Sequence, residues 1–115
     1  MDTLTKIDII TRPSKYDDLK EALNEIGITG MTITHVLGCG MQKGIKETYR
    51  GIPLEINLIP KIKFEIVVCE VPVEKVVETA RKVLYTGEVG DGKIFIYPVQ
   101  NVIKIRTGEE GVKAL

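Results

Sequence analysis

The chain has 115 residues, 43% of them hydrophobic, with 16 basic and 16 acidic side chains and a formal net charge of zero. The length favours one domain, 1–115, with one core, and the balanced charge excludes the positive field that holds nucleic acid through counterion release. No apolar run approaches the roughly 20 residues that span a bilayer, and the polar start lacks a signal-peptide core. We therefore expect a cytoplasmic protein without direct nucleic-acid contacts.

The first third of the chain predicts a strand, a helix and a second strand. Residues 4–11 alternate apolar and polar positions as a strand does. Ser14 is a suitable N-cap for the following helix, and Gly27 is a suitable end. The apolar stripe of this helix is Tyr16, Leu19, Leu23 and Ile26. Residues 31–37 are the second strand, in which the single histidine, His35, is interpreted as structural.

The last half of the chain repeats this order. Residues 61–68 alternate as a strand, and Pro72 suits the first turn of a helix that Gly87 ends. The apolar stripe of the helix is Val73, Val76, Val77, Ala80, Val83 and Leu84. Residues 93–99 are a fourth strand and 101–106 a short fifth one. The polar tail, 107–115, is expected to be mobile, or ordered only against a ligand or neighbour.

This order predicts an α+β, ferredoxin-like βαββαβ fold. Two helices cover only one face of a four-stranded sheet, so the other face meets either solvent or another copy. Ile10, Val36 and Val67 would lie on that face and are more apolar than a solvated face needs. We therefore expect a homo-oligomer. Cys39 and Cys69 form no disulfide or metal-binding pattern, and Cys69 is expected to be a small buried side chain.

Residues 38–58 form a long polar connection between two strands, and loops longer than about 12–15 residues usually have a function. Gly38 and Gly40 would allow a ligand to approach the backbone. The amide oxygen of Gln42 suits Mg²⁺ where phosphates supply other oxygens. Lys61, at the other end, could pair with a carboxylate or phosphate. A flexible loop root remains the plain alternative.

A second glycine turn, TGEVGDGK, spans residues 86–93. It resembles the opening of a P-loop, but Ile94 stands where a Ser or Thr would hold Mg²⁺. The turn also follows a helix and precedes a strand, the reverse of a P-loop, which excludes that class. Its backbone N–H groups, with Lys93, could still bind an anion, or it could be a plain turn. Lys104 and Arg106, two apart on a predicted strand, indicate either a polyanion site or an edge strand with protective charges.

The segments GITGMTITHVLGCG, QKGIKETYRG, IPKIKFEIVV, TGEVGDGKIFIYPV and VIKIRTGEEG occur in order along the chain. Together they resemble the nitrogen-regulatory PII signal-transduction proteins, most closely GlnK-type members of Gram-positive bacteria. The resemblance implies a homotrimer with a T-loop at 38–58, a glycine-rich B-loop at 85–93 and a C-terminal loop at 105–115. It also implies ATP or ADP in the clefts between subunits.

Site residues follow from matching motif positions in this family. One subunit would contribute Gly38, Gly40, Gln42, Gly90, Asp91, Gly92 and Lys93 to the nucleotide, and its neighbour Thr32, Lys104 and Arg106. Lys61 would pair with a carboxylate of 2-oxoglutarate. Mg²⁺ would bridge that effector, the ATP phosphates and Gln42, so 2-oxoglutarate should bind only with ATP.

The resemblance also implies partners reached through the T-loop. These are an ammonium transporter, which would bring the protein reversibly to the membrane, and regulators or enzymes of nitrogen assimilation. Tyr49, Arg50 and Leu54 are the expected contacts, with Arg50 entering the transporter; an ordinary solvated cation is the alternative for Arg50.

The chain departs from the family pattern at the arm. Leu54 replaces a tyrosine that is nucleotidylated in many members, and Ile52 a serine that is phosphorylated in others. Tyr49 matches a different, usually unmodified tyrosine. We therefore expect neither modification. Cys39 and Met41 also differ from the residues common in the family, and we expect these two changes to affect ATP affinity or the discrimination between ATP and ADP. Pro53 is expected to stiffen the tip of the arm and change the choice of partner.

An enzyme on the same fold, such as a phosphate-ester or acyl-phosphate hydrolase, is the competing hypothesis. Acyl-phosphate hydrolysis would need an anion cradle with a positioned arginine and asparagine near the N-terminus. Arg12 is present, but no glycine-rich loop follows it. An RNA-binding sheet would need stacking aromatics on its inner strands, and these are missing. Slow ATP hydrolysis is left open as a side activity, although no residue pattern identifies a general base.

Overall fold

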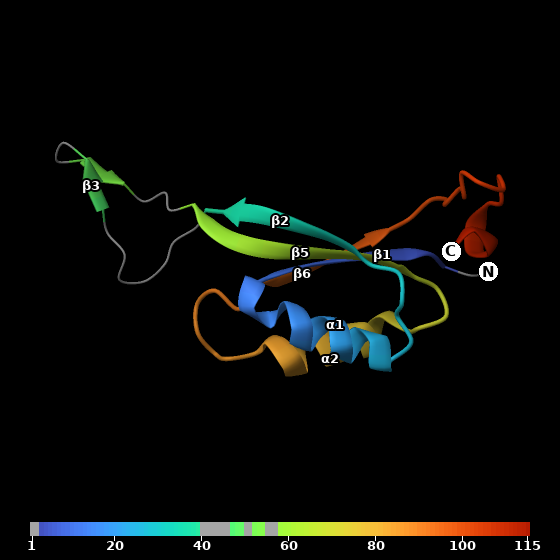
Figure 1. The fold of residues 1–115 in the computed structure, drawn as a ribbon, viewed down its shortest axis with the longest axis horizontal. Coiled ribbons are helices and arrows are strands. Elements are labelled where there is room, and N and C mark those ends of the chain that lie inside the picture. The colour runs from blue at the N-terminus through green and yellow to red at the C-terminus, as the bar shows by residue number, and fades with distance from the viewer. Residues whose placement is uncertain (1–2, 40–46, 50–51, 55–57) are drawn as a thin grey trace.

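The computed structural model describes residues 3–39, 47–49, 52–54 and 58–115. In chain order the elements are β1 (Thr5–Thr11), a 3-10 turn (Pro13–Lys15), α1 (Tyr16–Glu25), β2 (Thr32–Gly38), β3 (Glu47–Tyr49), β4 (Ile52–Leu54), β5 (Ile59–Val68), α2 (Val73–Leu84), β6 (Lys93–Pro98) and a second 3-10 turn (Gly111–Ala114) (Figure 1). Within these ranges, no helix has the length and apolar character needed to cross a bilayer.

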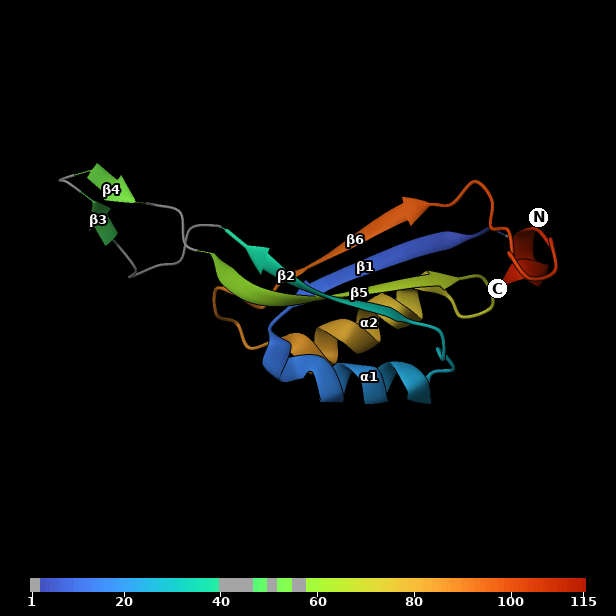
Figure 2. The same ribbon diagram turned by 45° about the horizontal axis from the view of Figure 1, so that its top comes forward.

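Four strands form one antiparallel sheet in the order β2-β5-β1-β6. Both helices cover the same face of this sheet (Figure 2). The predicted α+β, ferredoxin-like fold is therefore confirmed. Within the long connection, for which no strand was predicted, β3 and β4 pair with each other and place Glu47 opposite Leu54.

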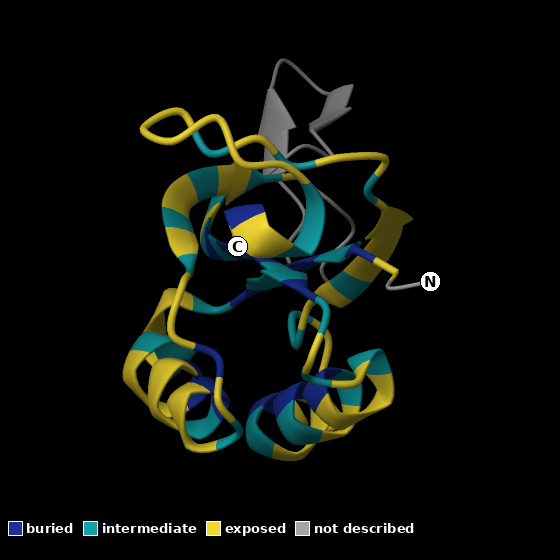
Figure 3. Cartoon of the chain, turned by 90° about the vertical axis from the view of Figure 1, so that its right-hand side faces the viewer, coloured by how far each residue is buried: buried dark blue, intermediate teal, exposed yellow. Residues whose placement is uncertain are grey.

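The core lies between the sheet and the helices because apolar side chains alternate along the strands. Ile9 faces both Phe64 and Ile94 across the ladders, and Ile33 faces Phe64 from β2. The buried core comprises Ile7, Ile9, Leu19, Leu23, Ile28, Ile62, Phe64, Ile66, Val68, Val76, Ala80 and Leu84. Figure 3 shows the buried sides of both helices turned inward. Each large side chain contributes about 1.5–3 kcal/mol by leaving water.

The opposite face of the sheet carries a charged centre that no pattern in the sequence indicated. We call Lys6, Asp8, Lys63 and Glu65 the charge quartet. Lys63 Nζ lies 2.8 Å from Glu65 Oε1 and 3.8 Å from Asp8 Oδ2. The hydrogen bond from Lys63 lowers the pKa of Glu65 and raises the pKa of Lys63. Asp8 is only 3% exposed, and its Oδ1 accepts no hydrogen bond from any described residue.

The start of α1 differs from the prediction. Ser14 is not its N-cap, because Pro13 begins a 3-10 turn over Pro13–Lys15 and Lys15 takes the cap position without a side-chain cap bond. Proline fixes its own φ near the helical value, which allows this tight turn to form before α1. The acidic first turn, Asp17 and Asp18, is as expected.

The C-terminal segment also differs, since residues 101–106 form no strand. Ile103 makes an isolated bridge with Glu110. Lys104 N–H donates to Glu109 O at 2.8 Å, and Gly108, whose φ is +76°, donates to Lys104 O at 2.7 Å. The chain thus turns back on itself at Gly108 instead of extending along the sheet. Ala114 is 9% exposed, so the tail packs within its own chain.

Candidate anion-binding site

Loop 85–93 connects α2 to β6, and its glycines are required by its geometry. Gly87, Gly90 and Gly92 have φ values of +86°, +106° and +105°, which L side chains adopt only with strain. At Gly92 there is also no room, because a Cβ would lie 1.9 Å from the carbonyl oxygen of Ile10 on β1. The loop can therefore lie directly on the end of β1.

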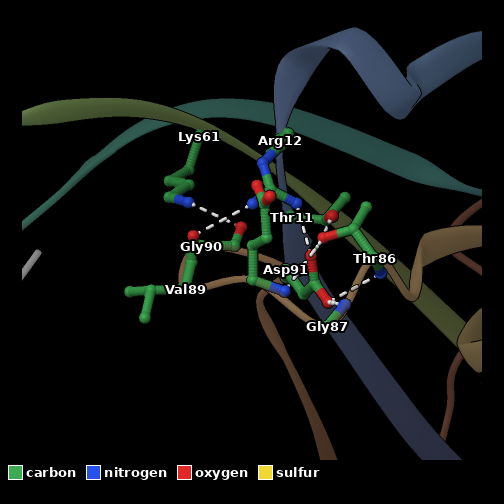
Figure 4. Close-up of polar contacts among 9 residues, drawn as sticks. Thr11, Arg12, Lys61, Thr86, Gly87, Val89, Gly90 and Asp91 are labelled. Atoms are coloured by element: carbon green, nitrogen blue, oxygen red, sulfur yellow. Dashed lines mark hydrogen bonds and ion pairs between the residues drawn. The ribbon is translucent and has the colours of Figure 1, made fainter. Parts of the chain in front are cut away.

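Three consecutive carbonyl groups of this loop accept hydrogen bonds from the sheet (Figure 4). Arg12 donates to Val89 O at 3.0 Å, and Lys61 Nζ donates to Gly90 O at 3.0 Å. The hydroxyl of Thr11 donates to Asp91 O at 2.9 Å. These donors come from the end of β1 and the start of β5, so the sheet fixes the orientation of the loop's peptide units.

This orientation leaves a row of N–H groups available. In a trans peptide the N–H points opposite to the C=O, so the N–H groups of Gly90, Asp91 and Gly92 point away from Thr11, Arg12 and Lys61. None of the three donates a hydrogen bond to another described residue. Successive free N–H groups in a glycine-rich turn form an anion-binding concavity. The loop can therefore bind a phosphate or carboxylate.

The carboxylate of Asp91 holds the loop together from within. Its Oδ1 lies 2.5 Å from Arg12 and also accepts the hydroxyl of Thr86. Its Oδ2 accepts the N–H groups of Thr86 and Gly87 at 2.8 and 3.0 Å. Arg12 first, and then Thr86, hold the pKa of Asp91 well below its usual range. The side chain is thus an ionised anchor of the loop, while the predicted nucleotide contact of Asp91 stays a prediction.

The two ends of the long connection meet this loop. Gly38 ends β2 and pairs with Ile59 at the start of β5. A Cβ at Gly38 would lie 3.4 Å from Lys61 Cγ, and the same lysine reaches Gly90. The structure therefore brings Gly38, Lys61 and residues 90–93 together at one end of the sheet (Figure 1).

Several predicted residues of the arm lie outside the described residues, namely Gly40, Met41, Gln42 and Arg50. Tyr49 and Leu54 lie in β3 and β4, on opposite strands of the small ladder. Their roles toward partners stay predictions.

The remaining predicted residues lie at the other end of the sheet. Thr32 begins β2 and Gly38 ends it, which separates them by about 20 Å at roughly 3.3 Å per residue. Lys104 and Arg106 follow β6 in the C-terminal segment (Figure 1). A single chain therefore does not bring Thr32, Lys104 and Arg106 to loop 85–93.

Thr32 lies in a cleft that was not predicted from the sequence. The cleft has a volume of about 580 Å³. Glu65, Val67, Cys69 and Leu115 are among its lining residues, and Cys69 is half-buried rather than buried. Its walls come from four separate segments, and Thr32 is the only lining residue that was predicted to contact a ligand.

The chain is similar to known proteins along nearly its whole length. Residues 4–109 match the family model of nitrogen regulatory protein P-II. A nitrogen regulatory PII-like protein of Bacillus subtilis is 53% identical over 110 residues, which are 96% of this chain and 95% of that protein. The solved GlnK–ATP complex of B. subtilis aligns with a TM-score of 0.83 and 47% identity, covering 100% of this chain and 99% of its own. Arabidopsis thaliana PII bound to citrate aligns with a TM-score of 0.79 and 39% identity, covering 99% and 94%.

Proposed function

Because this chain belongs to the nitrogen regulatory protein P-II family, we propose that it senses ATP or ADP together with 2-oxoglutarate and signals through its T-loop, residues 38–58. One observation carries the proposal. The three carbonyls of residues 89–91 are held by Arg12, Lys61 and Thr11, which leaves adjacent N–H groups for phosphate. The similarity to a protein solved as a GlnK–ATP complex supports the same ligand.

In this proposal the nucleotide spans two copies of the chain. The phosphates lie on loop 85–93 with Lys93, beside Gly38, Gly40 and Gln42. The base and ribose lie in the cleft at Thr32 of a neighbouring copy, whose Lys104 and Arg106 close the phosphate site. Since each chain carries the two half-sites at opposite ends, a head-to-tail contact between copies brings the two kinds together, and such contacts form a ring when the rotation between copies closes. A homotrimer is the ring we propose.

Lys61 is the proposed link between effector and T-loop. It lies at the C-terminal root of the arm and donates to Gly90 O at 3.0 Å. A 2-oxoglutarate carboxylate at Nζ would compete with this carbonyl for the ammonium group and would alter the contact between arm and loop. Citrate, bound in the Arabidopsis PII structure, is likewise a polycarboxylate, which supports a carboxylate ligand here.

The donor set fits Mg²⁺ only with help from the ligands. Among the described residues, no group of three or more His, Cys, Asp or Glu side chains could hold a metal ion. Hard oxygen donors would therefore come from the ATP phosphates, 2-oxoglutarate and the amide of Gln42. When bound, the ion would supply charge neutralisation between these anions.

The signal would reach partners through the arm. We propose an ammonium transporter and regulators or enzymes of nitrogen assimilation, contacted by Tyr49, Arg50 and Leu54. The protein would be cytoplasmic and would reach the membrane only through the transporter. Leu54 and Ile52 have no hydroxyl to modify, so neither of the two known modifications would control the arm; a nucleotidyl adduct found on the arm by mass spectrometry of native protein would refute this.

The proposal is regulatory rather than catalytic, in line with relatives named nitrogen regulatory proteins. The hydrolase alternative needs an arginine available to a substrate. Arg12 instead contacts Asp91 and Val89, so the structure adds no support for it. Any ATP hydrolysis would be a slow side activity.

Calorimetric titration tests the proposal directly. We expect ATP and ADP to bind, and 2-oxoglutarate to bind only in the presence of Mg-ATP. Replacing Lys93 by Ala should weaken ATP binding roughly 10- to 100-fold, the value of a charge-assisted hydrogen bond. The matched control, Lys75→Ala, changes an exposed lysine in the first turn of α2. Absence of ATP binding at millimolar concentration, or 2-oxoglutarate binding without nucleotide, would refute it.

A further inference from the structure

Arg12 holds loop 85–93 by two different contacts. One terminal nitrogen lies 2.5 Å from Asp91 Oδ1, and the other donates to Val89 O at 3.0 Å. The Arg12 and Asp91 side chains are 26% and 23% exposed. Charge-assisted hydrogen bonds are stronger in such partly shielded places than in open water. Arg12 therefore fixes both a charge and a peptide orientation in the loop.

Asp91 presents a difficulty for an anion site. Its carboxylate lies in the same loop as the free N–H groups of Gly90 and Gly92, and a negative charge there opposes phosphate binding. In the structure both carboxylate oxygens are occupied by Arg12, Thr86 and Gly87. The guanidinium of Arg12 neutralises the charge of Asp91. The N–H groups of Thr86 and Gly87 and the hydroxyl of Thr86 donate hydrogen bonds to the Asp91 carboxylate oxygens.

We propose that Arg12 is a positioning residue of the phosphate site. By neutralising Asp91 and fixing Val89 O, it orients the loop so that peptide N–H groups, and not a carboxylate, face the bound anion. Asp91 is then a loop anchor and not a ligand of phosphate or Mg²⁺. This inference rests on the proposed function, because it assigns roles within the same phosphate site.

The order of contacts explains why the pair is needed. The N–H groups of Gly90 and Gly92 are directed by the carbonyls of Val89 and Asp91, which are held by Arg12 and Thr11. Loss of Arg12 would remove two contacts together: the hydrogen bond to Val89 O and the ion pair with Asp91. Replacing Asp91 by Asn as well would remove the unpaired charge and keep one carbonyl oxygen for the N–H groups of Thr86 and Gly87.

Three variants, Arg12→Gln, Asp91→Asn and their combination, separate these roles. Binding of ATP and of inorganic tripolyphosphate would be measured by calorimetry with and without Mg²⁺. We expect Arg12→Gln to weaken both ligands roughly 10- to 100-fold. The double variant should bind more tightly than Arg12→Gln but less tightly than Asp91→Asn, because the second change removes the exposed charge without restoring the donor to Val89 O.

Further readouts distinguish positioning from a general loss of structure. Arg12→Lys should restore most of the affinity by keeping the positive charge, and its amide NMR signals for Gly90 and Gly92 should lie near the wild-type positions. In Arg12→Gln these two signals should shift while core amides do not. Lys75→Gln, which removes one exposed positive charge elsewhere, is the control for net charge. If Arg12→Gln does not fold, the affinities of Arg12→Lys and Asp91→Asn for ATP and tripolyphosphate are compared instead.

The measured affinities distinguish a failure of the role proposed for Arg12 from a failure of the proposed function. Wild-type affinity in Arg12→Gln, or a double variant weakened by the product of the single effects, would overturn the inference and leave the proposed function intact. Loss of only the Mg²⁺-dependent affinity in Asp91→Asn would make Asp91 a metal ligand and also overturn it. Failure of the wild-type protein to bind ATP or tripolyphosphate would remove both proposals.

Discussion

The two ends of the sheet differ in how their polar groups are used. At the loop end, Arg12 and Lys61 are engaged with carbonyls of loop 85–93. At the C-terminal end, the side chains of Lys104 and Arg106 form no ion pair with any described residue. The loop end is thus held in shape by its own chain, and the other end is not. In our proposal each end is one half of a nucleotide site, which is complete only between two chains.

The largest expected difference in stability is between substitutions at two turn glycines. Gly92 lies in loop 85–93 and Gly108 in the C-terminal segment. Gly92→Ala would place Cβ 1.9 Å from Ile10 O, whereas Gly108→Ala has a similar positive φ but nothing within 4 Å. Gly108→Ala should cost about 1–2 kcal/mol of stability, and Gly92→Ala about 3 kcal/mol or more, with loss of ATP binding. Urea denaturation and calorimetry measure both; equal losses at the two glycines would contradict the close packing on β1.

The division between chains can be tested by mixing subunits. Lys93→Ala impairs the loop half and Arg106→Ala the other half, and each should weaken ATP binding roughly 10- to 100-fold. When the two variants are refolded together, random assortment around a ring should restore about a quarter of the sites to full affinity. Calorimetry or filter binding would count those sites. If the mixture has no tight sites, both halves belong to one chain.

The loop end should also differ in its response to acid. The folded-state pKa of Asp91 is lowered by Arg12 and Thr86, so its contribution to stability is complete above the unfolded-state value of about 3.9. It is lost as pH falls through the lowered folded-state pKa. The stability difference between wild type and Asp91→Asn should therefore stay constant from about pH 7 to 5 and shrink only below about pH 4. Denaturant titrations across this range measure it, and a difference that vanishes near neutrality would contradict the ion pair.

The smallest effect is expected at the C-terminal end. Asn101 Nδ2 donates to Glu110 at 2.9 Å, and Asn101 Oδ1 accepts from the N–H groups of Val102 and Gly111 at 2.9 and 3.2 Å. Asn101→Ala should cost about 1 kcal/mol and loosen the segment after β6 without affecting loop 85–93. Faster hydrogen exchange at Val102, whose N–H donates to Asn101 Oδ1, is the expected result, with unchanged exchange at Gly87; unchanged exchange at Val102 would contradict it.

The sequence predicted the parts of the fold whose signal is local. Alternation along β5 and the apolar stripe of α2 depend on neighbouring residues, and both are confirmed by the buried Phe64 and Val76. The strand predicted at 101–106 was wrong, although the residues there are suitable for a strand. In the structure Ile103 makes only an isolated bridge with Glu110. Strand formation depends on a partner as well as on propensity.

For the candidate anion-binding site, the sequence predicted the type of loop but not the contacts that hold it. Glycine spacing indicated an anion-binding loop, but the contact of Arg12 with Asp91 joins residues about 80 positions apart and depends on the register of β1 against β6. The charge quartet was missed for a similar reason. Lys6 and Lys63 look like ordinary solvated residues along each strand, and only the pairing of β1 with β5 brings them around Asp8.

The charge quartet has a consequence for which substitutions the sheet can accept. Asp8 is nearly buried, and its Oδ1 accepts no hydrogen bond from any described residue, so its charge is balanced by the Nζ atoms of Lys6 and Lys63 at 3.5 and 3.8 Å. Removing one of these lysines leaves a buried carboxylate short of a counter-charge, which is more destabilising than replacing the whole group by apolar side chains of similar volume.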